Sequence, residues 1–173
     1  MSEISNPVSE DDFISFIELL NENSVDYILV GGQCLLTHGF TRFTEDIDIL
    51  CKDAGLIGAK RLLKVISKVP DSGVSELDDP LILAHDKNEE HDVIRVNAQY
   101  TIDIMYSCSG FTYEDIIDDI IMVKNDESGF YVPCAGLSTL REMKRNSSRP
   151  KDISDCASID LFLSMDTCNA PSI

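Results

Sequence analysis

The chain has 173 residues, with 14 Lys and Arg against 31 Asp and Glu, which gives a net charge of −17 and an isoelectric point near 4.3. This acidity excludes broad electrostatic binding to nucleic acid phosphates and favours cationic ligands, namely metal ions, cationic small molecules or a basic protein. Hydrophobic residues make up 43% of the chain, which excludes compositional disorder and suffices for one compact domain.

The sequence shows no membrane or secretory signal. Its N-terminal residues lack a basic stretch followed by an apolar one, and its apolar runs have the length of strands rather than of a bilayer span. The six cysteines form no Cys-x-x-Cys pair, a spacing that is typical of free thiols in a reducing compartment. We therefore expect a cytoplasmic protein without membrane association.

Helices and strands alternate through the first half of the chain. Ser9 starts a Ser-x-x-Asp capping sequence, and the apolar residues after it recur at helical spacing. The elements expected in this half are a helix over 9–20, a strand over 25–30, a short helix over 33–38, a strand over 46–51 and a helix over 56–69.

The second half is expected to contain shorter elements. The expected strands are 81–84, 93–96, 101–106 and 129–132, and the expected helices are 113–121, 137–144 and 151–165. Because helices and strands alternate without a strict β-α-β rhythm, we expect an α+β fold: a mixed β-sheet with helices packed on it and a helical C-terminal segment. The whole chain, 1–173, is expected to form one domain, with its core at about 9–135 and the helical segment at about 136–166.

Three carboxylates on two expected strands are the strongest functional signal. Asp46 and Asp48 are two apart on one strand, so both side chains emerge on the same face, and Asp103 stands between two isoleucines on a later strand. Carboxylates this close repel one another unless a hard cation such as Mg²⁺ or Mn²⁺ binds them. If the two strands are neighbours, three carboxylates are enough to hold two metal ions about 4 Å apart for phosphoryl transfer.

Alternatives to this interpretation remain open. An Asp-x-Asp pair is common in a chain with 31 acids, and acids on a solvated sheet face give the same pattern. Asp86, Asp92 and Asp115 compete with Asp103 for the role of the third carboxylate.

A glycine pair strengthens the case for a phosphate site. Gly31 and Gly32 follow an expected buried strand, open a helix and precede Asp46 by fewer than twenty residues. Glycines at such a point let backbone N–H groups approach a triphosphate. A Gly-Gly pair after a strand is also a common turn, so its meaning depends on the carboxylates that follow it.

The order of these motifs resembles that of the DNA polymerase beta-like nucleotidyltransferase superfamily. The segment is most similar to the minimal nucleotidyltransferases and the abortive-infection (AbiEii) toxin branch, in which Gly-Gly, a Tyr-Gly or His-Gly, Arg-x-Thr and Asp-x-Asp recur in order. In this chain those motifs are Gly31-Gly32, His38-Gly39, Arg42 with Thr44, and Asp46 with Asp48. The segment from Lys144 to Asp155 resembles the C-terminal segment of proteins in the same branch.

The resemblance implies Mg²⁺-dependent transfer of a nucleoside monophosphate from an NTP to a hydroxyl group. It implies that Asp46 and Asp48 bind the metal that holds the triphosphate, and that Asp103 completes a second metal site. Gly31 and Gly32 are expected at the phosphates, with Gln33 offering a polar contact beside them.

Cationic residues are expected to help bind the triphosphate. Besides Gly31 and Gly32, which we call the glycine turn, and Gln33 beside them, the nucleotide-binding candidates are Arg42, Thr44, Lys144 and Lys151. Two alternatives stay open: Arg149 and Lys151 pair with the acids of the last helix, and Arg42 pairs with Glu45 in its own loop.

The acceptor is open at this stage. An RNA or tRNA end, a protein and a small molecule all fit, whereas extended DNA binding is not expected from so acidic a chain. The resemblance also suggests a toxin–antitoxin or defence system with a protein partner. The alternative functions are a non-catalytic nucleotide-binding antitoxin or interaction module on the same fold, and a metal-dependent phosphohydrolase.

Overall fold

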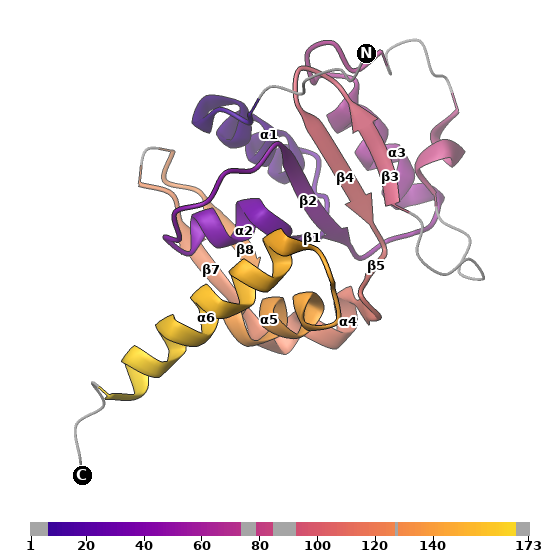
Figure 1. Ribbon diagram of the computed structural model, residues 1–173. Coiled ribbons are helices and arrows are strands. Elements are labelled where there is room, and N and C mark those ends of the chain that lie inside the picture. The colour runs from indigo at the N-terminus through magenta and orange to yellow at the C-terminus, as the bar shows by residue number, and fades with distance from the viewer. Residues whose placement is uncertain (1–6, 74–78, 85–92, 127, 169–173) are drawn as a thin grey trace.

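The computed structural model describes residues 7–73, 79–84, 93–126 and 128–168 (Figure 1). The expected loop over 86–92 lies outside the described residues, and so do Asp86 and Asp92, two of the competing carboxylates. Within the described ranges, we find no helix with the length and apolar content needed to cross a membrane.

Six strands of the described residues form one mixed sheet. Their bounds are β1 Tyr27–Val30, β2 Asp46–Cys51, β3 Val93–Asn97, β4 Thr101–Met105, β7 Ile120–Lys124 and β8 Tyr131–Ala135. Their order is β3-β4-β2-β1-β8-β7, with β2 parallel to β4, β1 parallel to β8, and the other neighbours antiparallel. A separate ribbon pairs β5 (Ser107–Cys108) with β6 (Phe111–Thr112).

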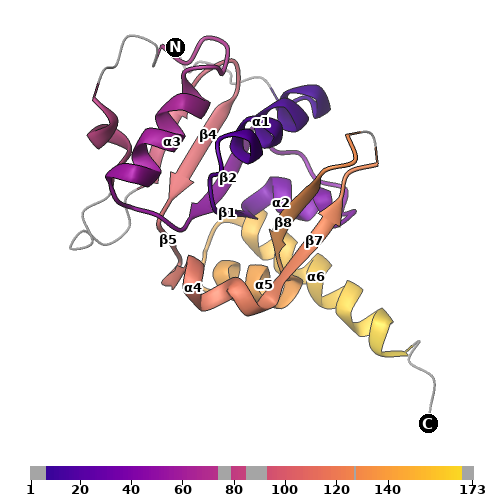
Figure 2. The same cartoon turned by 180° about the vertical axis from the view of Figure 1, so that it is seen from behind.

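Helices pack on this sheet and close the chain. The α-helices are α1 Glu10–Glu22, α2 Gly31–Thr37, α3 Leu56–Ile66, α4 Tyr113–Ile116, α5 Leu137–Arg145 and α6 Pro150–Cys168. Helices α1 and α3 contact each other beside the sheet (Figure 2). Helices α5 and α6 also contact each other, and α6 extends away from the rest of the chain toward the C-terminus (Figure 1).

The core forms where the sequence has its most regular apolar patterns. The Ser9 hydroxyl accepts a hydrogen bond from the Asp12 backbone N–H at 3.1 Å, which caps α1 as expected. Helix α1 buries Phe13, Phe16, Ile17 and Leu20, which recur at helical spacing. All four residues of β1 are buried, because β1 lies between β2 and β8 in the middle of the sheet.

The strand expected over 81–84 is wrong. This segment forms a short 3₁₀ helix, η2 (Pro80–Leu83), which the Asp79 carboxylate caps by accepting a hydrogen bond from the Leu81 N–H at 2.9 Å. Proline at the first position suits a helix start, since it lacks the N–H that would otherwise be unpaired. Only Leu83 of these apolar residues is buried, a pattern of one turn rather than of a strand.

The helix expected over 113–121 is too long. Helix α4 ends at Ile116, a 3₁₀ turn η3 (Ile117–Asp119) follows, and the remaining apolar residues begin strand β7. A run of four apolar residues, 120–123, is compatible with either state, and its pairing with β8 decides for the strand.

Candidate active site

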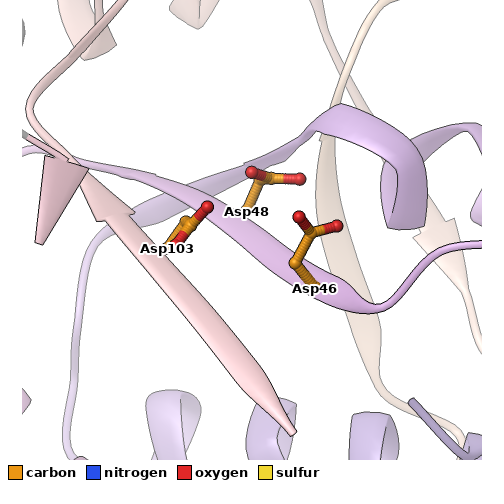
Figure 3. Close-up of side chains that lie close together, drawn as sticks. All are labelled: Asp46, Asp48 and Asp103. Carbon is orange, nitrogen blue, oxygen red and sulfur yellow. The ribbon is translucent and has the colours of Figure 1, made fainter. Parts of the chain in front are cut away.

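The three expected carboxylates meet at one point of the sheet. Asp46 and Asp48 lie on the same face of β2, and the parallel register of β2 with β4 places Asp48 directly opposite Asp103. Figure 3 shows the three side chains converging from the two strands, and each offers an oxygen within 4.8 Å of the others. The competing Asp115 lies elsewhere, since its carboxylate accepts hydrogen bonds from Thr112 at the start of α4.

The buried side of β2 fixes this face. Ile47 and Ile49 are fully buried and alternate with the two aspartates, so the strand cannot slip by one residue without exposing both isoleucines. The carboxylate pair is therefore held in place by the core on the other face of the strand.

The carboxylates are crowded enough to change their own chemistry. Burial, and after it the neighbouring charges of Asp46 and Asp103, together raise the pKa of Asp48 to about 7 against the weaker opposite influence of Lys144 and Arg42. A cation bound beside Asp48 would favour its charged form and lower this pKa, so proton binding and cation binding are expected to compete at the site.

A basic residue that was not predicted from the sequence, Arg95, contacts this cluster. Arg95 of β3 binds Asp103 with two hydrogen bonds, from Nε to Oδ1 at 2.8 Å and from Nη2 to Oδ2 at 2.7 Å. The antiparallel register of β3 with β4 places the two residues directly opposite each other. The sequence could have predicted this pair. The strands expected at 93–96 and 101–106 are joined by a short connection, and a hairpin that turns near residue 99 pairs residue 95 with residue 103.

The carboxylates open into a cavity of about 630 Å³. Gly31 and Gly32 line it where β1 meets α2. Gly31 has φ +67°, and a Cβ there would lie 2.0 Å from Oδ2 of Asp48; a Cβ on Gly32 would lie 1.6 Å from Nη1 of Arg42. Both glycines are therefore needed for side chains of the site to pack against the backbone at the start of α2.

Gln33 is placed differently from the glycines. It is buried in α2 and is not among the residues that line the cavity. Its Oε1 has no hydrogen-bond partner among the described residues. The structure thus brings the two glycines to the carboxylates but not the glutamine.

Arg42 and Thr44 both face the cavity, and each is tied to an aspartate. The Thr44 hydroxyl donates to Oδ1 of Asp46 at 2.9 Å, which orients that carboxylate. Nε of Arg42 lies 2.9 Å from Oδ1 of Asp155 on α6, so Arg42 pairs with the C-terminal helix rather than with Glu45. Phe43 between them is 60% exposed and also lines the cavity.

Lys144 is buried between two acids of α6. Its Nζ lies 2.9 Å from Asp152 and 2.9 Å from Asp155. Arg149 and Ser147 also bind Asp152, at 2.7 and 2.6 Å. Burial raises the pKa of Asp152, but the hydrogen bonds from Ser147, Lys144 and Arg149 outweigh it and leave that pKa at about 2.

The walls of the cavity differ in charge from the rest of the chain. Its basic residues outnumber its acidic ones by five to four, although the whole chain has more than twice as many acids as bases. The basic residues are Arg42, Arg95, Lys144, Arg149 and Lys151. Lys151 is exposed, at the first turn of α6. Such a cavity suits an anionic ligand that brings a metal ion with it.

Solved structures that share this fold include the two described here. The lincosamide antibiotic adenylyltransferase LnuA, in its lincomycin-bound crystal structure, is 15% identical, with a TM-score of 0.60 over 90% of this chain and 98% of its own. TM1012 from Thermotoga maritima, a candidate nucleotidyltransferase, is 13% identical, with a TM-score of 0.53 over 88% of this chain and 91% of its own. The expected α+β nucleotidyltransferase fold is therefore confirmed.

No protein-family model matches the sequence, and no curated protein matches it. At these identities the structural likeness establishes the fold alone, because one fold hosts several functions.

Proposed function

We propose that this protein is a Mg²⁺- or Mn²⁺-dependent nucleotidyltransferase, which transfers an NMP from an NTP to a hydroxyl acceptor and releases pyrophosphate. One observation carries the proposal: Asp46, Asp48 and Asp103 converge from two parallel strands beside the glycine turn. A convergence of three acids on a partly buried sheet face is costly unless a cation compensates it.

The donor set fits a hard divalent cation. All three ligands are carboxylates, their oxygens lie within 4.8 Å of one another, and burial together with the charges of Asp46 and Asp103 raises the pKa of Asp48. Oxygen ligands of this kind suit Mg²⁺ or Mn²⁺ and not a thiophilic metal. A bound divalent cation would neutralise charge on the triphosphate and the leaving pyrophosphate.

The rest of the cavity would bind the nucleotide. Gly31 and Gly32 offer backbone close to Asp48, where the triphosphate would lie beside the carboxylates. Arg42 and Lys144 bring positive charge to the same cavity from their pairs with α6, and the exposed Lys151 also lines it.

In the proposed reaction the acceptor hydroxyl oxygen forms a bond to the α-phosphorus, and the bond from that phosphorus to the bridging oxygen of pyrophosphate breaks. Asp103 would position the hydroxyl and accept its proton, while the other two aspartates hold the triphosphate through its metal. Thr44 keeps Asp46 oriented through its hydrogen bond.

The acceptor class and the biological setting are further parts of the proposal. LnuA, named for its action on a lincosamide antibiotic, makes a hydroxyl-bearing small molecule one candidate, next to an RNA end or a protein. The order of motifs from Gly31 to Asp48 supports the minimal nucleotidyltransferase or AbiEii branch, and with it a toxin–antitoxin or defence role. Expression of the wild type but not of Asp48→Asn should then slow growth.

Labelling identifies both nucleotide and acceptor. The purified protein is incubated with Mg²⁺, a cell extract and each NTP labelled on the α-phosphate, and the RNA, protein and small-molecule fractions are separated. We expect one fraction to become labelled by the wild type and not by Asp48→Asn, while label on the γ-phosphate is recovered in pyrophosphate.

The competing functions give different results in the same assay. Tight binding of Mg²⁺-NTP without labelling of any fraction would support a non-catalytic nucleotide-binding module. Release of phosphate or pyrophosphate at an equal rate with and without extract would support a phosphohydrolase.

A further inference from the structure

Arg95 binds the Asp103 carboxylate, which is one of the three expected metal ligands. Its Nε and Nη2 each bind a different oxygen of Asp103, so the guanidinium takes both oxygens in a bidentate pair. Among the described residues, neither Asp46 nor Asp48 has a bidentate cationic partner, and Thr44 offers Asp46 only a neutral hydroxyl. The three carboxylates therefore differ: two are free to take a cation, and the third already has one.

The two partners also differ in exposure. The Asp103 side chain is 7% exposed and fixed in β4, whereas the Arg95 side chain is 57% exposed on β3 at the edge of the sheet. An exposed arginine on an edge strand can leave its partner at little cost in packing, and a buried aspartate cannot follow it. Arg95 also lines the cavity, and its two bonds to Asp103 do not use Nη1, which leaves a donor for a phosphate.

We propose that Arg95 is a built-in counter-ion of Asp103 that a divalent cation must displace, so that the metal position at Asp103 stays closed until nucleotide arrives and the freed guanidinium binds its phosphates. The inference rests on the proposed function for the nucleotide, and on the carboxylate cluster alone for the metal. Arg95 thus acts on the metal position through Asp103 and, once freed, contacts the nucleotide directly.

Mn²⁺ binding tests this without any turnover. Free Mn²⁺ is measured by electron paramagnetic resonance during titration of the wild type, first alone and then with a non-hydrolysable NTP. The wild type should bind one Mn²⁺ tightly alone and a second only with the nucleotide. Arg95→Met should bind the second Mn²⁺ without nucleotide up to about 5-fold more tightly than the wild type, the upper factor for one partly exposed ion pair.

Three variants separate the proposal from simpler effects. Arg145→Met removes the same charge from an exposed arginine that pairs with Glu142 away from the cavity, and it should leave Mn²⁺ binding unchanged. Arg95→Lys keeps the charge but loses the bidentate pair, so its Mn²⁺ affinity should fall between those of the wild type and Arg95→Met. Asp103→Asn should lose the second Mn²⁺ in every condition.

Each outcome of these measurements supports or overturns a stated part of the proposal. If Arg95 only stabilises the strand pair, Arg95→Met will lower the melting temperature and leave Mn²⁺ affinity equal or weaker, which overturns the inference while the metal site and proposed function stand. If neither the wild type nor Arg95→Met binds Mn²⁺, the carboxylate cluster is no metal site, and the proposed function fails with the inference. Weaker binding of the NTP analogue by Arg95→Met, unlike Arg145→Met, supports the phosphate contact; equal binding by both overturns that part.

Discussion

At the scale of a single residue, the surroundings of Asp48 raise the pKa of its carboxyl group. A carboxyl group normally titrates near pH 3.8, and here burial and two neighbouring carboxylates raise the pKa of Asp48 to about 7. The folded protein therefore binds this proton more tightly than the unfolded chain, so the stability that the neutral carboxyl contributes is complete below pH 3.8 and is lost as pH rises toward 7.

This sign predicts a pH dependence of unfolding. Without divalent cations, the free energy of unfolding should fall by about 2 kcal/mol between pH 5.5 and pH 8 through Asp48. Urea unfolding in EDTA measures it, and Asp48→Asn should lose that part of the slope. Mg²⁺ should stabilise the wild type more at pH 8 than at pH 5.5. Equal slopes for the two proteins would show that Asp48 titrates normally.

Removing one carboxylate should separate metal binding from folding. Asp46→Asn keeps the acceptor for the Thr44 hydroxyl but removes a repelling charge, so its melting temperature in EDTA should equal or exceed that of the wild type. The rise in melting temperature with Mg²⁺-NTP should disappear, whereas Asp118→Asn, outside the cavity, should keep it. A persisting rise in Asp46→Asn would move the metal elsewhere.

The glycine turn can be tested with a matched pair. Gly31 and Gly129 both have positive φ, +67° and +74°, but only at Gly31 would a Cβ collide with a side chain, Asp48. Gly129→Ala should cost about 1 kcal/mol for the backbone alone, and Gly31→Ala at least about twice that, with a loss of Mg²⁺-NTP affinity. Urea unfolding and calorimetric titration measure the two effects. Equal costs would mean that Asp48 does not pack against this turn.

At the scale of elements, ion pairs attach α6 to the body of the protein. Asp155 binds both Arg42, before β2, and Lys144, on α5, and all three side chains are largely buried. Most of the basic residues selected from the sequence are therefore also structural, and their charge reaches the cavity from a wall that the C-terminal helix holds in place.

Breaking this attachment should be costly. Asp155→Ala leaves two buried cations short of a partner, and we expect a loss of about 3 kcal/mol in urea unfolding. Asp160→Ala removes the exposed partner of Arg141 on the same helix and should change stability little. Similar losses for both variants would mean that burial of the Asp155 pairs adds nothing.

At the scale of the whole molecule, the net charge of −17 limits what the protein binds. The positive residues of the cavity are too few and too localised for a nucleic acid duplex, so no binding to a 30-base-pair DNA is expected at about 0.15 M salt. Fluorescence anisotropy measures this. Binding that weakens steeply with added salt would reveal a basic surface outside the cavity.

Much of the site could be predicted from the sequence, because the patterns that indicate it are local. The alternation of Asp46 and Asp48 with two isoleucines predicts a strand with both acids on one face, and the pair Gly31 and Gly32 marks the start of a helix. Both patterns depend only on the geometry of a few consecutive residues. The apolar run at 120–123 shows the limit, because its periodicity suits a helix or a strand equally.

The remaining features depend on which distant segments meet. The parallel pairing of β2 with β4 places Asp103 beside the other two carboxylates. The packing of α6 brings Asp155 into ion pairs with Arg42 and Lys144. Strand register and helix docking are set by burial of the whole core, not by neighbours along the chain. The sequence by itself therefore determined the chemistry of the site, and the tertiary structure decided its partners, Arg95 among them.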